Sequence, residues 1–178
     1  MDNNDNKQEE NSLTKTIVLM KQKKFISVTN KGNPIYITIN NCVMPFGVEK
    51  YKEKYILNLE LEIQKNNELY NIYTEILNLE NYIGNINNIK TTIDIKEILK
   101  NKIFVPTLKQ SLNGYILRTQ FKSPEIYILK KTGDKLFLSH ENLKNTSGII
   151  SIVLKGIWYT NEFYGLLWMT KEINLKKL

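Results

Sequence analysis

The C-terminal part of the chain reads Ser147-Gly-Ile-Ile-Ser-Ile-Val-Leu-Lys-Gly-Ile-Trp158-Tyr-Thr-Asn-Glu-Phe-Tyr-Gly165-Leu-Leu-Trp168-Met-Thr-Lys-Glu-Ile-Asn-Leu175. Two runs rich in β-branched and aromatic residues, separated by a short polar turn, predict a pair of adjacent strands. Both tryptophans of the protein lie in this pair, together with Lys155 and Lys171. Aromatic rings interleaved with cations on adjacent strands are suited to holding unstacked bases beside phosphates. The alternative is an amphipathic hairpin that closes an ordinary β core.

Strand patterns also precede this pair. Apolar, β-branched runs predict strands at residues 16–20, 25–28, 35–39, 55–63, 114–122, 126–130 and 136–138. The alternation from Leu57 to Ile63 is typical of a half-buried strand. Pro45 and Gly47 break the pattern before it, and Ser123-Pro124 ends a strand later in the chain.

The period changes to three and four residues in the middle of the chain. Apolar residues from Leu69 to Ile83 predict a helix with one apolar face, capped at Asn66 or Asn67 and ended by Gly84. Residues 95–100 predict a shorter helix, for which Thr92 is a candidate cap. The order is strands, helices, strands, which indicates an antiparallel or mixed α+β domain with a helical insertion at about residues 66–101.

Charge and length favour one basic domain. The chain has 178 residues and a formal net charge of +7. Residues 1–12 hold four carboxylates against one lysine and lack apolar periodicity, so we expect a disordered acidic tail followed by a single domain over residues 13–178. A basic domain favours a polyanionic partner. The alternative is codon bias, because the chain is rich in Lys, Asn and Ile and has a single arginine.

The sequence lacks the residues that several kinds of catalytic and metal site require. One His and one Cys are too few ligands for a zinc site, and no phosphate-binding glycine loop is present. We expect no Ser-His-Asp or Cys-His catalytic arrangement, because His140 would be the sole base. We therefore expect no enzymatic activity, no metal and no cofactor. The single cysteine, Cys42, excludes an intramolecular disulfide and suits a reducing, intracellular compartment. No signal peptide or membrane span is indicated.

Alternation along the strands selects candidate binding residues. Arg118, Gln120 and Lys122 share one face of their strand, and Lys155 and Tyr159 share a face of another. The same counting places Trp158 with the core and leaves Trp168 for a ligand. The residues expected to contact nucleic acid are Lys23, Lys24, Lys50, Tyr51, Lys54, Arg118, Lys122, Lys155, Tyr159, Trp168 and Lys171.

Two motifs resemble a known family. They are Leu154-x-Gly-Ile-Trp158, followed after six residues by Gly165-x-x-Trp168-x-x-x-x-Ile173, and Val43-Met-Pro45-Phe46-Gly47-Val-x-x-Tyr51 before Tyr55-Ile-Leu-x-Leu. This pattern resembles single-stranded DNA-binding proteins of large eukaryotic DNA viruses, which are related to phage replication proteins with an OB fold. Members of that group often end in an acidic tail, whereas this chain ends in a basic one and is acidic at its start.

The resemblance implies a fold and a function. The expected fold is an OB-fold-like antiparallel β-barrel with the helical segment inserted. The expected function is sequence-tolerant single-stranded DNA binding in viral DNA replication, recombination or repair, in the host cytoplasm, a viral factory or the nucleus. RNA, replication proteins and a second copy of the chain remain open as partners, and no membrane is expected. The alternatives are a viral structural or protein-interaction module and a subunit of an enzyme whose active site lies elsewhere.

Overall fold

The computed structural model describes residues 16–176, and the expected acidic tail at residues 1–12 lies outside them. The strands are β1 (Ile17–Lys21), β2 (Ile26–Asn30), β3 (Asn33–Met44), β4 (Val48–Tyr51), β5 (Lys54–Leu61), β6 (Ile103–Phe104), β7 (Leu108–Gln110), β8 (Tyr115–Leu129), β9 (Lys135–Phe137), β10 (Thr146–Tyr159) and β11 (Phe163–Leu175). The helices are α1 (Asn67–Gly84), α2 (Ile93–Leu99) and the short 3-10 turns η2 (Ile86–Asn88) and η3 (His140–Asn142). The predicted β-rich order with a helical insertion is confirmed.

Five strands form an irregular ring. Pairings run from β3 to β5, β8, β11, β10 and back to β3. Counted along the chain this is first, second, third, fifth, fourth, the strand order of the partly open five-stranded OB-fold barrel. The β3–β5 seam is the single pair Val43 and Glu60, so the sheet does not close into a regular barrel. The sheet is mixed, because β11 runs parallel to β8 and β6, so the expectation of an antiparallel barrel is wrong for these two pairings.

Two strands differ from the sequence pattern. β8 is one strand of 15 residues instead of two, and it bends at Ser123, whose φ is 45°. The predicted break at Ser123-Pro124 is therefore a bend within a strand. The central residues of β5 are buried on both faces instead of one, since Asn58 is 5% exposed and Glu60 is 9% exposed. Ser111 donates to Glu60 at 3.1 Å from the loop after β7, which covers the outer side of this strand end.

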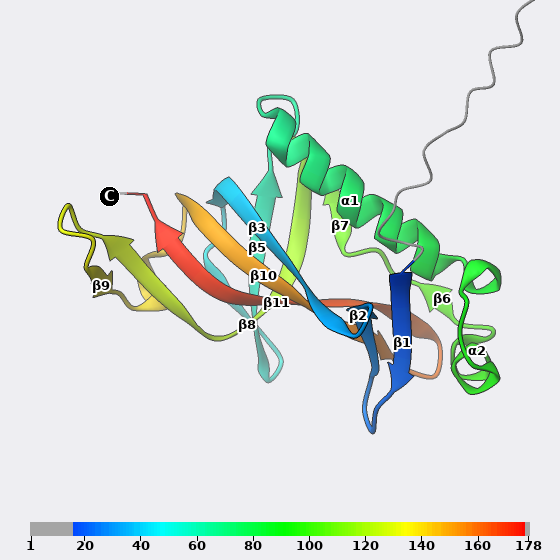
Figure 1. Ribbon diagram of the computed structural model, residues 1–178. Helices are drawn as coiled ribbons and strands as arrows, with labels where there is room; N and C mark the ends of the chain where they lie inside the picture. The colour runs from blue at the N-terminus through cyan, green and yellow to red at the C-terminus, as the bar shows by residue number, and fades with distance from the viewer. Residues whose placement is uncertain (1–15, 177–178) are drawn as a thin grey trace, which may run out of the picture.

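Helix α1 forms for the reasons that its sequence predicts. The Asn66 side chain accepts a hydrogen bond from the Glu68 amide at 2.8 Å, which caps the helix start. Its apolar stripe is buried against β3 and β5 through Leu69, Ile72, Ile76, Leu79 and Ile83. Figure 1 shows α1 along one side of the strands, with α2 beyond its C-terminal end and the β8–β9 hairpin at the opposite end of the molecule. Thr92 does precede α2, but its side chain makes no capping bond.

The core lies inside the ring and under α1. It includes Trp168 at 1% exposure and Cys42 at 0%. Thr119 and Thr170, both buried, join β8 to β11 inside the core through their hydroxyls, 2.7 Å apart. Over residues 16–176, no helix combines the length and the apolar character that a membrane span requires.

Candidate nucleic-acid interface

The outer face of β8 carries cations, as the alternation predicts. Arg118 and Lys122 are exposed, whereas Leu117, Thr119 and Phe121 between and beside them are buried. Cross-strand partners point to the same side of a sheet. The partner of Arg118 on β5 is Asn58, and that of Gln120 is Ile56. The polar side of β5 therefore continues this outer face of β8.

Neighbouring strands extend the face on both sides. On β4 and β5, Tyr51 pairs with Lys54, and both are exposed. On β11, Met169 pairs with Gln120, and the exposed Lys171 lies two residues further along. We call the resulting surface the basic face, and it consists of Tyr51, Lys54, Arg118, Lys122 and Lys171. The predicted residue Lys50 is not part of it, because its partner Tyr55 and the next partner Phe121 belong to the opposite side of the sheet.

The cations of the basic face form no ion pairs with residues that the structure describes. Among the ion pairs of residues 16–176, none involves Lys54, Arg118, Lys122 or Lys171. The ring of Tyr51 is 59% exposed, and the Lys52 ammonium lies 5.7 Å from its centroid. A surface of this kind presents positive charge and a ring to solvent, which are the groups that track phosphates and stack bases.

A groove opens beside Arg118, between the β3–β4 turn and β7. It has a volume of about 320 Å³ and is lined by Phe46, Glu49, Asn58, Thr107, Lys109, Gln110, Ile116 and Arg118. We call it the Phe46 groove. Its ring, Phe46, is 53% exposed, and Lys109 is exposed on the strand opposite Ile116. The sequence reasoning did not select Phe46 or Lys109. The Pro-Phe-Gly turn could have indicated an exposed ring at Phe46. No local pattern in the sequence distinguishes Lys109 from the other lysines.

The turn that carries Phe46 is held rigidly. Gly47 has a φ of 66°, and a Cβ atom there would lie 3.0 Å from the backbone nitrogen of Lys144. Only glycine combines this conformation with so close an approach. The carbonyl of Met44 accepts from the amides of Gly47 at 3.3 Å and Asn145 at 2.9 Å. The turn is therefore fixed against the segment that precedes β10.

The opposite wall of the groove is held by a buried carboxylate. Glu80 of α1 is 3% exposed. It accepts hydrogen bonds from the Thr107 amide at 2.5 Å and the Leu108 amide at 3.3 Å, and also from the Thr107 hydroxyl. Burial raises the pKa of Glu80, although these three bonds oppose the rise. Glu80 thus positions the segment that brings Lys109 to the groove.

A second basic group lies on other strands. Lys23 and Lys24 are exposed in the β1–β2 turn. The Lys155 ammonium lies 5.3 Å from the centroid of the Phe25 ring, which follows that turn. These three predicted residues gather around Phe25 at the β1–β2 hairpin. They come from strands other than those of the basic face.

The structure reverses the two tryptophans. Trp168, expected to face a ligand, is buried at 1% exposure, and its Nε1 has no hydrogen-bond partner within residues 16–176. Trp158, expected in the core, is half-buried. Trp158 leaves the core because a β-bulge between Leu154 and Gly156 leaves Lys155 unpaired and moves the later residues of β10 to the other face. Trp168 lies on β11 and pairs with the buried Leu154, so both side chains point into the core. The half-buried Tyr159 packs against the core.

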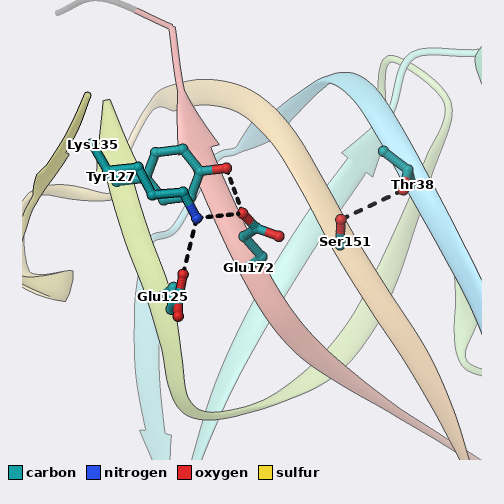
Figure 2. Close-up of polar contacts among 6 residues, drawn as sticks. All are labelled: Thr38, Glu125, Tyr127, Lys135, Ser151 and Glu172. Atoms are coloured by element: carbon teal, nitrogen blue, oxygen red, sulfur yellow. Dashed lines mark hydrogen bonds and ion pairs between the residues drawn. The ribbon is translucent and has the colours of Figure 1, made fainter. Parts of the chain in front are cut away.

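A cluster of opposite charges marks the end of the basic face. Beyond the bend of β8, the Lys135 ammonium lies 3.1 Å from a carboxylate oxygen of Glu125 and 3.2 Å from one of Glu172 (Figure 2). The Tyr127 hydroxyl also donates to Glu172.

Among residues 16–176 no group of acidic, His and Cys side chains could hold a metal ion.

Comparison with known proteins relates the fold to phage proteins. No protein-family model matches the chain, and no curated protein matches it in sequence. The structure is similar to that of the single-stranded DNA-binding protein from bacteriophage Enc34 in complex with single-stranded DNA, with a TM-score of 0.51, 11% identity, and 91% of this chain and 96% of the other covered. A C-terminal truncation of that protein gives a TM-score of 0.51, 12% identity, and coverage of 93% and 98%. At these identities the similarity establishes the fold.

Proposed function

We propose that the chain binds single-stranded DNA on its basic face without forming or breaking covalent bonds. The observation that carries the proposal is the gathering of Arg118, Lys122, Lys54 and Tyr51 on one open surface, where the cations form no ion pair with any residue from 16 to 176. β5 and β8 are the second and third strands of the ring, and OB folds bind oligonucleotides on the face of those two strands. This property of OB folds supports the choice of Lys54, Arg118 and Lys122 as binding residues.

The fold comparison supports the same ligand. The similar phage protein forms a complex with single-stranded DNA, and its fold matches over 91% of this chain. A role in viral DNA replication, recombination or repair is part of the proposal and rests on the resemblance of the two sequence motifs. The wider choice of partner, RNA or replication proteins, stays a prediction.

A salt titration tests the proposal. Binding of a labelled oligo-dT strand and of a duplex of equal length is followed by fluorescence anisotropy. Neutralising a few phosphates on a single strand gives a slope of log affinity against log salt of roughly −2 to −4. We expect such a slope and weaker binding of the duplex. A flat profile, or tighter binding of the duplex, would overturn the proposal and favour the interaction-module alternative.

A further inference from the structure

We propose that the Phe46 groove is a base pocket in which Glu49 selects a base bearing an exocyclic amino group, so that cytosine is favoured over thymine. This inference rests on the proposed function and adds a base preference to it. Glu49 places a carboxylate on a surface whose other charged groups attract phosphates. Such a group weakens binding of a polyanion unless it makes a compensating contact.

Glu49 is oriented by its own strand neighbours. Its cross-strand partner is Ile56, so its side chain lies on the outer side of the sheet. One carboxylate oxygen, Oε2, accepts from Nδ2 of Asn58 at 2.6 Å. Asn58 is 5% exposed and belongs to the central part of β5, so this donor is fixed. Among residues 16–176, Oε1 of Glu49 has no hydrogen-bond or ion-pair partner, although cations line the same groove.

The free oxygen determines which base edge fits. An ionised carboxylate only accepts hydrogen bonds, and in protein–DNA contacts it accepts from N4 of cytosine. Thymine presents carbonyl oxygens on both sides of its single N3–H, and these repel a carboxylate. In a single strand this edge is not engaged in pairing and is open to the protein. The charge of Glu49 therefore discriminates between two pyrimidines of similar size.

The rest of the groove suits one nucleotide. Phe46 offers an exposed ring on a turn that Gly47 holds rigid, and a ring of this kind stacks any base. Lys109 and Arg118 line the same groove and supply cations for the adjoining phosphate. A stacking ring, two cations and one oriented acceptor are the elements of a base-reading pocket.

The test compares two homopolymers. Affinities for oligo-dC and oligo-dT of equal length are measured at one salt concentration by anisotropy. We expect the wild-type protein to bind oligo-dC about tenfold more tightly, the effect of one good contact to a base edge. Glu49→Gln keeps an oxygen for Asn58 and places an amino group toward the groove, which suits O4 of thymine. We expect this variant to lose or invert the preference.

A matched control separates charge from base reading. Glu53, exposed in the β4–β5 turn, makes no hydrogen bond or ion pair among the described residues. Glu53→Gln removes the same charge and should tighten binding of both homopolymers equally, leaving their ratio unchanged. Equal wild-type affinities for the two homopolymers, or the same ratio in Glu49→Gln, would overturn the base pocket and leave the proposed function standing. Failure to bind either homopolymer would overturn both.

Discussion

The two halves of β8 use their charges in opposite ways. Before the bend at Ser123, Arg118 and Lys122 are exposed and unpaired within the described chain. After it, Glu125 shares Lys135 with Glu172 (Figure 2), and the Lys135 ammonium lies 4.0 Å from the centroid of the Tyr127 ring. The same strand therefore carries unpaired, exposed cations in one half and paired charges in the other.

The difference separates charges that are paired within the fold from charges that face solvent. In the second half, the Tyr127 hydroxyl and Lys135 hold the pKa of the Glu172 carboxyl below its usual range. These contacts attach β9 and the end of β8 to β11. In the first half no carboxylate of residues 16–176 forms an ion pair with Arg118 or Lys122, so both cations present their charge to solvent.

The largest effect of a substitution is expected on stability, at a residue of the core. Trp168 of β11 is buried at 1% exposure. Replacing it by alanine removes a large core side chain, and we expect Trp168→Ala to lower the free energy of unfolding by about 3–5 kcal/mol in urea denaturation. Trp158→Ala, at a half-buried site, should cost less. A larger loss for Trp158→Ala would show that the sequence-based assignment of the two faces was correct after all.

Next in size is the loss of binding when the open half is neutralised. Arg118→Ala combined with Lys122→Ala should weaken binding of oligo-dT at least tenfold at low salt. The salt slope should become shallower by about 0.7 for each phosphate that the variant no longer neutralises. The matched control is Lys65→Ala with Lys100→Ala, two cations already paired with Glu62 and Glu97. If both double variants weaken binding alike, binding depends on the net charge of the protein and not on the basic face. The contrast between the two halves of β8 would then be irrelevant to binding.

A smaller effect is expected at the carboxylate that holds the wall of the Phe46 groove. Glu80→Ala leaves three donors of Thr107 and Leu108 without their acceptor, at a cost of about 1–3 kcal/mol. Because the folded-state pKa of Glu80 is raised, its contribution is full below the unfolded pKa and falls as pH rises through the folded value. The stability difference between wild type and Glu80→Ala should therefore shrink from about pH 4 toward neutrality. A difference that grows over this range would contradict the raised pKa.

The smallest effect is expected in the neutralised half. Lys135→Met removes both ion pairs to Glu125 and Glu172 while keeping an apolar chain over the Tyr127 ring. Exposed ion pairs contribute little to stability. We expect faster amide hydrogen exchange in β9, with no measurable change in global unfolding or in oligo-dT affinity. Weaker binding of oligo-dT by this variant would extend the interface past the bend.

Local patterns predicted most of the elements correctly. The cap at Asn66, the apolar stripe of α1 and the outward set Arg118, Gln120 and Lys122 depend on neighbours within a few residues. The face of each tryptophan does not. Trp158 is turned outward by the bulge at Lys155, and Trp168 is turned inward by its pairing with the buried Leu154. No short-range pattern specifies that bulge or that pairing.

The residues of the Phe46 groove were beyond sequence reasoning for a related reason. Phe46 and Glu49 lie three residues apart, but Lys109 comes from β7, which only the folded chain brings beside them. Glu49 counts as one exposed carboxylate among many until its contact with Asn58 is known. Glu80 falls in the apolar stripe of α1, where a carboxylate is unexpected, and its partners on Thr107 and Leu108 lie 27 and 28 residues away.

The pairing of β3 with β10 has a consequence for synthesis of the chain. The Thr38 and Ser151 hydroxyls, 3.5 Å apart in Figure 2, are separated by 113 residues in sequence. At about 5–20 residues per second, β3 waits roughly 6 to 23 s on the ribosome before its partner strand is made. During that interval an open strand edge and the apolar side chains of Ile35, Ile37 and Ile39, all buried in the finished fold, are exposed to other nascent chains. The yield of this protein in a foreign host therefore depends on what covers β3 before the last strands emerge.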